Sequence, residues 1–367
     1  MPRVLILAND SSGLWLFRRN LLETLKQEGM EVTAVFPDDV YAGQIGELGA
    51  AVRRIPLNRR SVNPLEDLRL LRAYKNLLQE LSPDVVLTYT IKPNVYGGMA
   101  CRRMRIPYIA TVTGLGTAFE KGGFLGAVVT TLYRRGLKGA EAVFFQNDVN
   151  RGLFLEKRIL TADKARLVNG SGVDLEKYQA LSYPGHADDV TRFLYLGRLM
   201  REKGIVELIS AAGAMHDKYG GRVSFAAAGY DEEDGRQLVE DAVLRGILKR
   251  LPFQKDTIPL YREADVVVLP TWHEGMSNVL MEAGACARPV IASDIPGCRE
   301  IAADGETGFL IRPRSMDSLL EAMEKFMALS VKEREEMGRR GRAKMEKEFD
   351  RRFVVAAYLS EIKRILS

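Results

Sequence analysis

The chain has 367 residues, 46% of them hydrophobic and 28% charged, which is typical of a soluble globular protein with room for two domains. The apolar runs are too short to span a bilayer, and we expect no secretory signal before the first strand. Three cysteines and three histidines without metal-ligand spacing exclude a disulfide framework and a histidine-rich metal site, and they indicate a reducing compartment.

The net charge of +5 is unevenly distributed along the chain. Residues 1–180 contain 25 Lys and Arg against 18 Asp and Glu, whereas residues 181–367 contain 28 against 30. A basic first half suits an anionic partner such as a phospholipid surface or a lipid diphosphate. Nucleic acid is the competing partner, but no nucleic-acid-binding motif supports it. An excess of charge spread over solvated faces would give the same counts.

The first expected unit is a strand at residues 3–8, a turn at residues 9–13 and a helix, because apolar residues recur at helical spacing from Leu14 onward. Small and polar residues at such a helix start can receive a diphosphate or an acceptor hydroxyl. Four of them are candidate binding residues: Asn9, Asp10, Ser12 and Gly13. Ser11 or Ser12 serves equally well as a helix cap. Arg18 follows on the helix, either as a phosphate-binding residue or as an ordinary exposed arginine.

Strands are expected next at residues 31–36, 51–55, 84–89 and 107–112, with an amphipathic helix at 64–81. Lys92 and Thr113 each follow one of these strands. The loop from Thr113 to Phe119 has two glycines in the spacing of a dinucleotide fingerprint. Phe119 stands where the third glycine belongs and no helix follows directly, which excludes dinucleotide binding here.

Residues 124–138 allow two interpretations. An apolar stripe followed by clustered basic residues fits contact with a membrane interface. A core helix with a charged C-terminal turn fits the same pattern. The stripe comprises Leu125, Val128, Val129 and Leu132, with Tyr133 beside it, and the basic residues are Arg134, Arg135 and Lys138.

The second half of the chain opens after residues 178–190, whose turn-forming composition predicts a linker. A strand at 193–196 leads into a turn that contains Gly197, Arg198 and Lys203. Paired cations on such a turn suit the diphosphate of a nucleotide sugar, and would neutralise the charge that develops on a leaving phosphate. Both could equally be exposed residues at a helix start.

Residues 264–270 form an apolar, β-branched run that indicates a buried parallel strand, and helical periodicity resumes at Asn278. Ligands bind open α/β sheets at the carboxyl edge of the strands, so Glu274 in the turn and Glu282 on the helix can line one pocket. Gly275 permits a tight turn. The backbone N–H groups of residues 276–279 can hold an anion. Two solvated glutamates beside an ordinary helix are the alternative.

These two glutamates, with seven residues between them, and the preceding arginine and lysine resemble the motifs of the retaining glycosyltransferases of family 4, which have the GT-B fold. The resemblance covers essentially the whole chain. It implies an α/β protein with two Rossmann-like βαβ domains facing an interdomain cleft, and alternating strands and helices indicate the same domain type. The implied domains are residues 1–183 on the acceptor and membrane side, residues 190–350 binding the nucleotide sugar, and a C-terminal helix at 351–367 that crosses back.

The resemblance also assigns roles to residues. Arg198, Lys203 and Glu274 are implied to be catalytic, with Glu274 beside the donor sugar, and Glu282 is implied to hold the ribose hydroxyls. The other implied donor-binding residues are Gly13, Gly197, Phe253, Gly275, Met276, Ser277, Asn278 and Val279, and the acceptor-binding residues are Asn9, Asp10, Ser12, Arg18, Lys92 and Thr113. Many family members have a histidine near the position of Thr113, and this chain lacks it.

The implied activity is transfer of a hexose or N-acetylhexosamine from a UDP-sugar to a polyprenyl-diphosphate-linked saccharide, with retention, in the assembly of bacterial surface or glycoprotein glycans. The implied location is cytoplasmic, peripheral on the inner face of the plasma membrane. Because no Asp-x-Asp motif occurs, we expect no essential metal and no other cofactor. A UDP-sugar 2-epimerase or a soluble sugar-acceptor synthase of the same fold is one alternative, and a non-catalytic sugar-nucleotide or glycan-binding partner is another.

Overall fold

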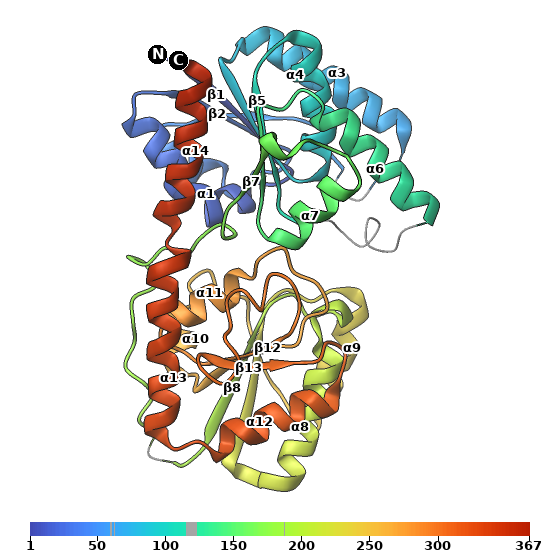
Figure 1. Cartoon of the computed structure of the whole chain (residues 1–367). Helices are drawn as coiled ribbons and strands as arrows, with labels where there is room; N and C mark the ends of the chain where they lie inside the picture. The colour runs from blue at the N-terminus through green and yellow to red at the C-terminus, as the bar shows by residue number, and fades with distance from the viewer. Residues whose placement is uncertain (59–60, 62, 115–122, 187) are drawn as a thin grey trace. The chain divides into compact units, whose positions relative to one another are not determined.

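The computed structural model describes residues 1–58, 61, 63–114, 123–186 and 188–367. They form two compact units, the first comprising Met1–Ser171 with Arg351–Ser367 and the second Gly172–Asp350. Each unit is built around one parallel sheet with helices on both faces (Figure 1), the doubly wound arrangement that alternating strands and helices produce.

Among the described residues, the sheet of the first unit has the order β3-β2-β1-β4-β5-β6-β7, and all neighbouring strands are parallel. The strands are β1 (Arg3–Leu7), β2 (Glu31–Phe36), β3 (Ala51–Arg54), β4 (Val85–Tyr89), β5 (Tyr108–Val112), β6 (Ala142–Phe145) and β7 (Ala165–Leu167). The helices are α1 (Ser11–Gln27), α2 (Ala42–Glu47), α3 (Pro64–Leu81), α4 (Gly98–Met104), α6 (Gly123–Leu137), α7 (Asp148–Glu156) and α14 (Arg351–Leu366).

Alternation along β1 explains how helices cover both faces of this sheet, because successive side chains of a strand point to opposite sides. Val4 and Ile6 pack in the core under α1 and α14, whereas Leu5 and Leu7 pack in the core under α3, α4 and α6. The C-terminal helix α14, which was expected to cross back to the first domain, belongs to this unit and contacts α1 (Figure 1).

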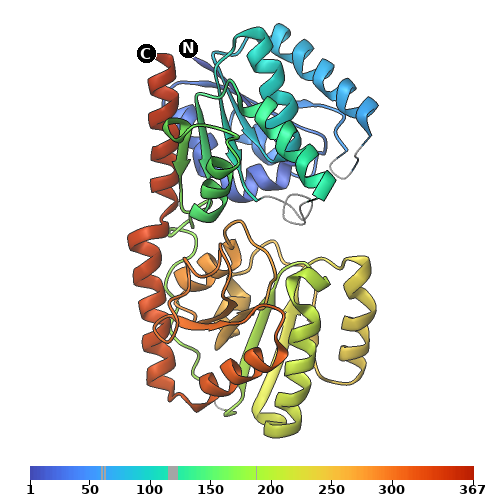
Figure 2. The same ribbon diagram turned by 45° about the vertical axis from the view of Figure 1, so that its right-hand side comes forward.

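The second unit has the sheet order β10-β9-β8-β11-β12-β13, again parallel throughout the described residues. Its strands are β8 (Thr191–Leu196), β9 (Val223–Ala228), β10 (Lys249–Leu251), β11 (Val266–Leu269), β12 (Val290–Ser293) and β13 (Gly308–Ile311). The helices are α8 (Ile205–Tyr219), α9 (Glu233–Leu244), α10 (Ile258–Glu263), α11 (Asn278–Ala285), α12 (Met316–Ala328) and α13 (Val331–Lys344). Helices α8 and α12 lie side by side (Figures 1 and 2).

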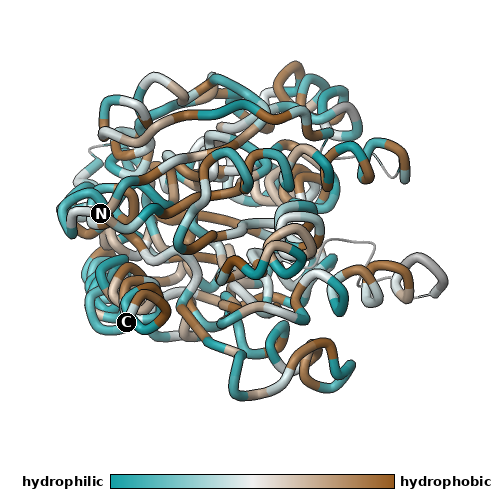
Figure 3. The backbone as a smooth tube through the Cα atoms, turned by 90° about the horizontal axis from the view of Figure 1, so that it is seen from above, coloured by the Kyte–Doolittle hydropathy of each residue, from teal (hydrophilic) through white to brown (hydrophobic). Residues whose placement is uncertain are grey.

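The helices are amphipathic, as the alternation of brown and teal along their turns shows in Figure 3. Helix α3 spans the expected residues 64–81 and turns a stripe that includes Leu71 and Tyr74 into the core. It begins with Pro64 after Asn63, whose side chain accepts from the Leu65 amide at 3.0 Å, a favourable start for a helix. None of the helices within the described residues combines the length and the apolar composition needed to cross a bilayer.

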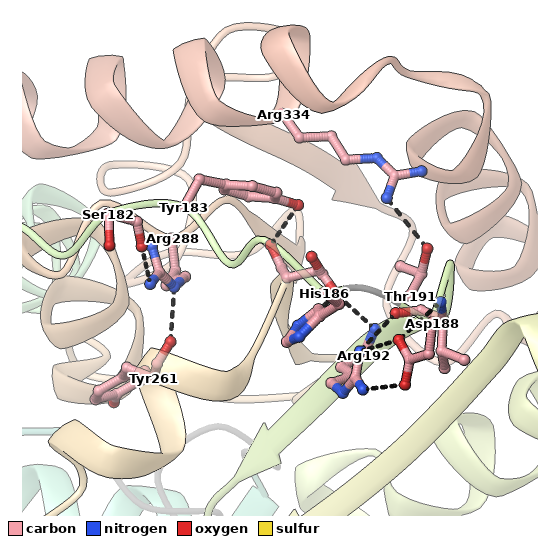
Figure 4. Close-up of polar contacts among 11 residues, drawn as sticks. Ser182, Tyr183, His186, Asp188, Thr191, Arg192, Tyr261, Arg288 and Arg334 are labelled. Carbon is pink, nitrogen blue, oxygen red and sulfur yellow. Dashed lines mark hydrogen bonds and ion pairs between the residues drawn. The ribbon is translucent and has the colours of Figure 1, made fainter.

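The segment expected as a linker, residues 178–190, is instead part of the second unit. Tyr178 is buried, and the Tyr183 hydroxyl donates to the Asp265 carbonyl at 3.3 Å (Figure 4). The division between the units accordingly falls earlier, between Ser171 and Gly172.

A buried arginine explains why this segment adheres to the second unit. Arg288 has no exposed surface, and it donates from Nε to the Tyr261 carbonyl at 2.6 Å and from Nη2 to the Ser182 carbonyl at 2.7 Å (Figure 4). A buried guanidinium without acceptors would carry a large desolvation cost. The segment around Ser182 supplies one of those acceptors, so its hydrogen bond with the Arg288 guanidinium holds it against the second unit.

The core interpretation of residues 124–138 holds for the inner face of the stripe. Four residues of α6 are buried or packed against the core: Val129, Leu132, Tyr133 and Leu137. Val128 is 38% exposed. Arg134 donates from Nη2 to the Lys157 carbonyl at 2.9 Å, while Arg135 and Lys138 are exposed. The side chains of residues 124 and 125 lie outside the described part of the chain.

Candidate functional site

The loops that follow β10, β9, β8, β11 and β12 lie along the carboxyl edge of the second unit's sheet. In sheet order they carry Phe253, Tyr230, Arg198, Glu274 and Gly297. Parallel strands that are neighbours end at the same edge. Phe253, Arg198 and Glu274, which were predicted from separate stretches of sequence, therefore lie along one edge of the second unit.

Lys203 and Glu274 form an ion pair that joins the two motifs. Lys203 Nζ lies 2.5 Å from Glu274 Oε1, with 17% and 16% of the two side chains exposed. Gly204 allows this approach, since its φ is +76° and a Cβ there would lie 2.0 Å from the Pro270 carbonyl oxygen. A charge-assisted hydrogen bond in partly desolvated surroundings is short and strong, so the pair fixes the orientation of the Glu274 carboxylate.

Arg198 is held much more loosely than Lys203. Half of its side chain is exposed, and its Nη1 is 3.5 Å from Glu232 Oε1. The backbone beneath it is firmly placed, because the Tyr195 hydroxyl donates to the Arg198 carbonyl at 2.7 Å. Burial raises the pKa of Tyr195, so the phenol remains a donor. The loop is therefore fixed while the guanidinium can turn toward an anionic ligand.

Helix α11 begins at Asn278 as predicted, and Ser277 is its N-terminal cap. Its Oγ caps the helix by accepting from a backbone amide three residues on, at 3.3 Å. Its own amide donates to the Gly297 carbonyl at 2.9 Å. The Ser277 amide is thus engaged within the protein, which leaves Met276, Asn278 and Val279 as the candidates for holding an anion at this helix start.

Glu282 lies on α11 and is positioned by two neutral donors. Tyr261 donates from its hydroxyl to Glu282 Oε2 at 2.9 Å, and Thr257 Oγ1 is 3.4 Å from the same oxygen. Burial, followed by the nearby Glu282 charge, raises the pKa of Tyr261 well above its usual value. These donors orient the carboxylate without neutralising it. Sequence reasoning missed both, because neither lies in a recognisable motif around Glu282.

Phe253 stacks on Tyr230, with ring centres 4.2 Å apart and an angle of 20° between the planes. The two residues are 40% and 58% exposed. Large aromatic side chains that remain exposed offer a face on which a planar ring can stack. The pair lies at the end of the edge that leads from Arg198, where the base of a bound nucleotide would be expected.

Trp272 supports the loop that carries Glu274, and the sequence pattern had not indicated it. Its indole Nε1 donates to Glu207 Oε1 at 3.0 Å, and its amide donates to the Glu202 carbonyl at 2.9 Å. The Arg314 guanidinium lies 4.4 Å from the centre of the indole ring. The strand end is thus fixed from three sides just before Glu274.

We expect Gly297→Ala to lower both the melting temperature and kcat. Gly297 has a φ of +86°, and a Cβ there would lie 2.7 Å from the Gly275 carbonyl oxygen and 3.0 Å from Glu274 Cβ. The left-handed backbone alone costs a non-glycine residue about 1–2 kcal/mol, and the clash would also move the Glu274 turn. Calorimetry and initial rates measure the two effects.

Gly305→Ala is the matched control, because Gly305 has a φ of +73° but open space at its Cβ position. It should lose stability only and keep its activity. Equal activity in the two variants would contradict a role for Gly297 in placing the Glu274 turn.

In the first unit, the loop after β1 forms a helix cap. Asp10 Oδ1 accepts from the Gly13 amide at 2.6 Å, so Asp10 is the cap, not Ser11 or Ser12. Ser11 is buried, and its amide donates to Asp38 Oδ2 at 2.9 Å. The Gly13 amide is engaged in this cap. Asn9 and Ser12 remain partly exposed at this sheet edge.

Arg18 is neither the exposed arginine nor an outward-facing phosphate ligand. It is 5% exposed, its guanidinium lies 5.1 Å from the centre of the Tyr89 ring, and Nη1 donates to the Phe17 carbonyl at 3.1 Å. A buried cation over an aromatic face is stabilised by the ring's electrons. Arg18 therefore packs inside the first unit.

Lys92 and Thr113 follow β4 and β5, which are neighbours in the sheet. Lys92 Nζ lies 2.8 Å from Asp67 Oδ1, with 13% and 17% of the two side chains exposed. Thr113 is partly exposed. The rest of the glycine-containing loop, residues 115–119, lies outside the described residues. Candidate acceptor residues of the first unit thus meet at one sheet edge, apart from Arg18.

Two family models match the chain, one in each half. "Glycosyl transferase 4-like domain" matches residues 12–170 and "Glycosyl transferases group 1" matches residues 183–344. Among curated proteins, the chain is 25% identical over 334 residues to the N,N'-diacetylbacillosaminyl-diphospho-undecaprenol alpha-1,3-N-acetylgalactosaminyltransferase of Campylobacter jejuni, covering 87% of this chain and 88% of that protein. It is 26% identical over 353 residues to the capsular polysaccharide biosynthesis glycosyltransferase CapM of Staphylococcus aureus, covering 92% and 90%.

Among solved structures, Alr3699/HepE of Anabaena in complex with UDP and glucose has a TM-score of 0.81 at 17% identity, covering 99% of this chain and all of that one. The two parallel-sheet units and this likeness show the GT-B fold. The family matches go further, and this chain belongs to the family 4 glycosyltransferases. The predictions of two Rossmann-like α/β domains and of the glycosyltransferase family are confirmed.

Proposed function

We propose that this glycosyltransferase moves a hexose or N-acetylhexosamine from a UDP-sugar to a polyprenyl-diphosphate-linked saccharide in bacterial glycan assembly, with retention at the anomeric carbon. The observation that carries the proposal is the arrangement of Arg198, Lys203 and Glu274 along one sheet edge, with Glu282 on the adjoining helix. The Campylobacter relative, named for a diphospho-undecaprenol-linked acceptor, supports the acceptor class. The UDP and glucose bound to the Anabaena protein are the precedent for the donor.

The donor would be held by groups that match its parts. Glu282 accepts from ribose hydroxyls, and the exposed face of Phe253 lies where a base can stack. Arg198 and Lys203 bind the diphosphate, whose negative charge grows as the bond to the sugar breaks. Fixed cations that stabilise this growing charge lower the barrier, because they need no reorganisation during the reaction.

Retention requires no nucleophile from the enzyme in this scheme. The Glu274 carboxylate is engaged by Lys203, so it serves as a hydrogen-bond acceptor for a hydroxyl of the donor sugar. The bond from the anomeric carbon to the diphosphate breaks, and the acceptor oxygen bonds to the same face. A phosphate oxygen of the leaving group takes the acceptor's proton. The enzyme contributes alignment and charge stabilisation.

Product analysis tests the proposal. Purified protein is incubated with a panel of UDP-sugars, with and without a membrane extract that supplies lipid-linked saccharides. We expect UDP release to depend on the extract, and the new linkage to have the donor's anomeric configuration by NMR. A UDP-sugar epimer formed without acceptor, a glycoside of a soluble sugar, or UDP-sugar binding without turnover would each replace the proposal with one of its alternatives.

We expect full activity in EDTA. The reason is that Arg198 and Lys203 supply the positive charge that a divalent cation would otherwise provide at the diphosphate. Initial rates with and without EDTA measure the effect. Inactivation that magnesium or manganese reverses would contradict the expectation.

We further propose that the enzyme meets its lipid-linked acceptor at an anionic membrane surface, with the exposed Arg135 and Lys138 of α6 contributing. Each basic residue near such a surface contributes about 1 kcal/mol, an attraction that salt screens. We expect Arg135→Ser with Lys138→Ser to reduce co-sedimentation with anionic liposomes at low salt. Arg339→Ser with Arg340→Ser, exposed in the second unit, is the control. Unchanged sedimentation of the α6 variant would exclude these residues from the contact.

A further inference from the structure

A pocket of about 330 Å³ lies in the first unit, outside the residues assigned to the donor. Leu57 and Asn58 reach it from the segment after β3, Glu66 and Arg69 from the first turns of α3, and Lys92 from the segment after β4. Both strands end at the carboxyl edge of the sheet, where ligands of doubly wound folds bind. Its volume is at the small end of ligand pockets, which suits one sugar ring.

The positive charge of Lys92 in this pocket is compensated by the Asp67 carboxylate. Asp67 lies 2.8 Å from Lys92 Nζ through one carboxylate oxygen and accepts from the Tyr96 hydroxyl at 2.7 Å through the other. Burial, and then this hydrogen bond, raise the pKa of Tyr96, so the phenol stays a donor. Lys92 therefore presents N–H groups to the pocket while its charge is compensated.

Glu66 gives the pocket its selectivity. Its Oε2 is buried and has no hydrogen-bond partner among the residues that the structure describes. A desolvated carboxylate oxygen favours a ligand that donates an O–H or N–H group, and it repels a phosphate. Leu57 and the buried Leu70 add apolar surface on which the C–H face of a pyranose can pack.

We propose that this pocket binds the terminal sugar ring of the acceptor, an uncharged hexose or N-acetylhexosamine, and that Glu66 accepts a hydrogen bond from one of its hydroxyl or amide groups. The proposal rests on the proposed function for the identity of the acceptor. Asn58, Arg69 and Lys92 supply further hydrogen-bonding groups around the ring. The diphosphate of the acceptor then lies outside this pocket.

Ligand-observed NMR with the full-length protein tests the proposal, using methyl N-acetylglucosaminide as the probe. We expect saturable binding to the wild type, weakened about ten-fold or more in Glu66→Leu because a hydrogen bond to a charged group is lost. Glu80→Leu, at an exposed position of the same helix, should bind like the wild type. Glu66→Leu loses a carboxylate from the first turn of α3, which is slightly destabilising at a helix N-terminus, but it also removes a buried oxygen without a partner, so its melting temperature should stay close to that of the wild type.

Inorganic pyrophosphate is the second probe, and it should not displace the sugar. Absence of saturable sugar binding, equal binding by Glu66→Leu, or displacement by pyrophosphate that Arg69→Leu abolishes would overturn the proposal; the last would make the pocket an anion site. Calorimetry with UDP on the same samples tests the proposed function separately. Wild-type protein that binds UDP while Glu66→Leu leaves the KM for a lipid-linked acceptor unchanged would refute only the sugar pocket.

Discussion

Arg198→Ala and Lys203→Ala are each expected to lower kcat by about 10²–10³-fold, the usual effect of removing one contact to charge that develops in a transition state. Arg198→Ala should leave the melting temperature unchanged, since the side chain is half exposed and its contact to Glu232 is 3.5 Å long. Lys203→Ala should also destabilise the protein, because it leaves the partly buried Glu274 carboxylate without its cation. Steady-state rates and calorimetric melting separate these outcomes.

Arg222→Ala provides the control for a lost exposed arginine, because Arg222 is 63% exposed and its closest carboxylate is 4.0 Å away. It should behave like the wild type in both measurements. Rates within a few-fold of wild type in both Arg198→Ala and Lys203→Ala would remove the diphosphate assignment, whatever happened to stability.

Glu282→Gln is expected to weaken UDP binding by about ten-fold or more, since a hydrogen bond to a charged group contributes about 1.5–3 kcal/mol. The change keeps the size of the side chain and one oxygen that can accept from Tyr261, so the fold should persist. Titration calorimetry with UDP gives the affinity. The KM for the acceptor should change little, because the loss is confined to the nucleotide.

Glu263→Gln, exposed at the end of α10, is the control for this loss of charge. Tyr261→Phe should weaken UDP binding less than Glu282→Gln, because it removes a group that orients the carboxylate but not the carboxylate itself. UDP affinity equal to wild type in Glu282→Gln would mean that the ribose is held elsewhere.

Secondary structure was predicted correctly where the residues that determine an element are neighbours in the sequence. The strand, turn and helix around Glu274 and the boundaries of α3 are examples, because periodicity and capping are properties of neighbouring residues. The pairing of Lys203 with Glu274 depends on β8 and β11 being neighbours in the sheet. No single stretch contains that information.

Two ambiguities in the sequence have clear physical causes. The stripe on α6 was ambiguous because an amphipathic helix presents the same spacing to a core as to a membrane, and burial of Tyr133 decides for the core on that face. Ser11 and Asp10 are both good caps. Asp38, which is distant in the sequence, accepts a hydrogen bond from the Ser11 amide, and Asp10 caps the helix instead.

The buried guanidinium of Arg288 determines where the halves of related enzymes can be joined in a chimaera. A second unit cut at residue 190 would lose the Ser182 carbonyl and leave a buried cation short of acceptors, and leaving a buried donor unpaired costs about 1–3 kcal/mol, more for a charged group. A half cut at Gly172 keeps that carbonyl. The connecting chain thus belongs with the second unit, and a functional chimaera would have to be joined ahead of it.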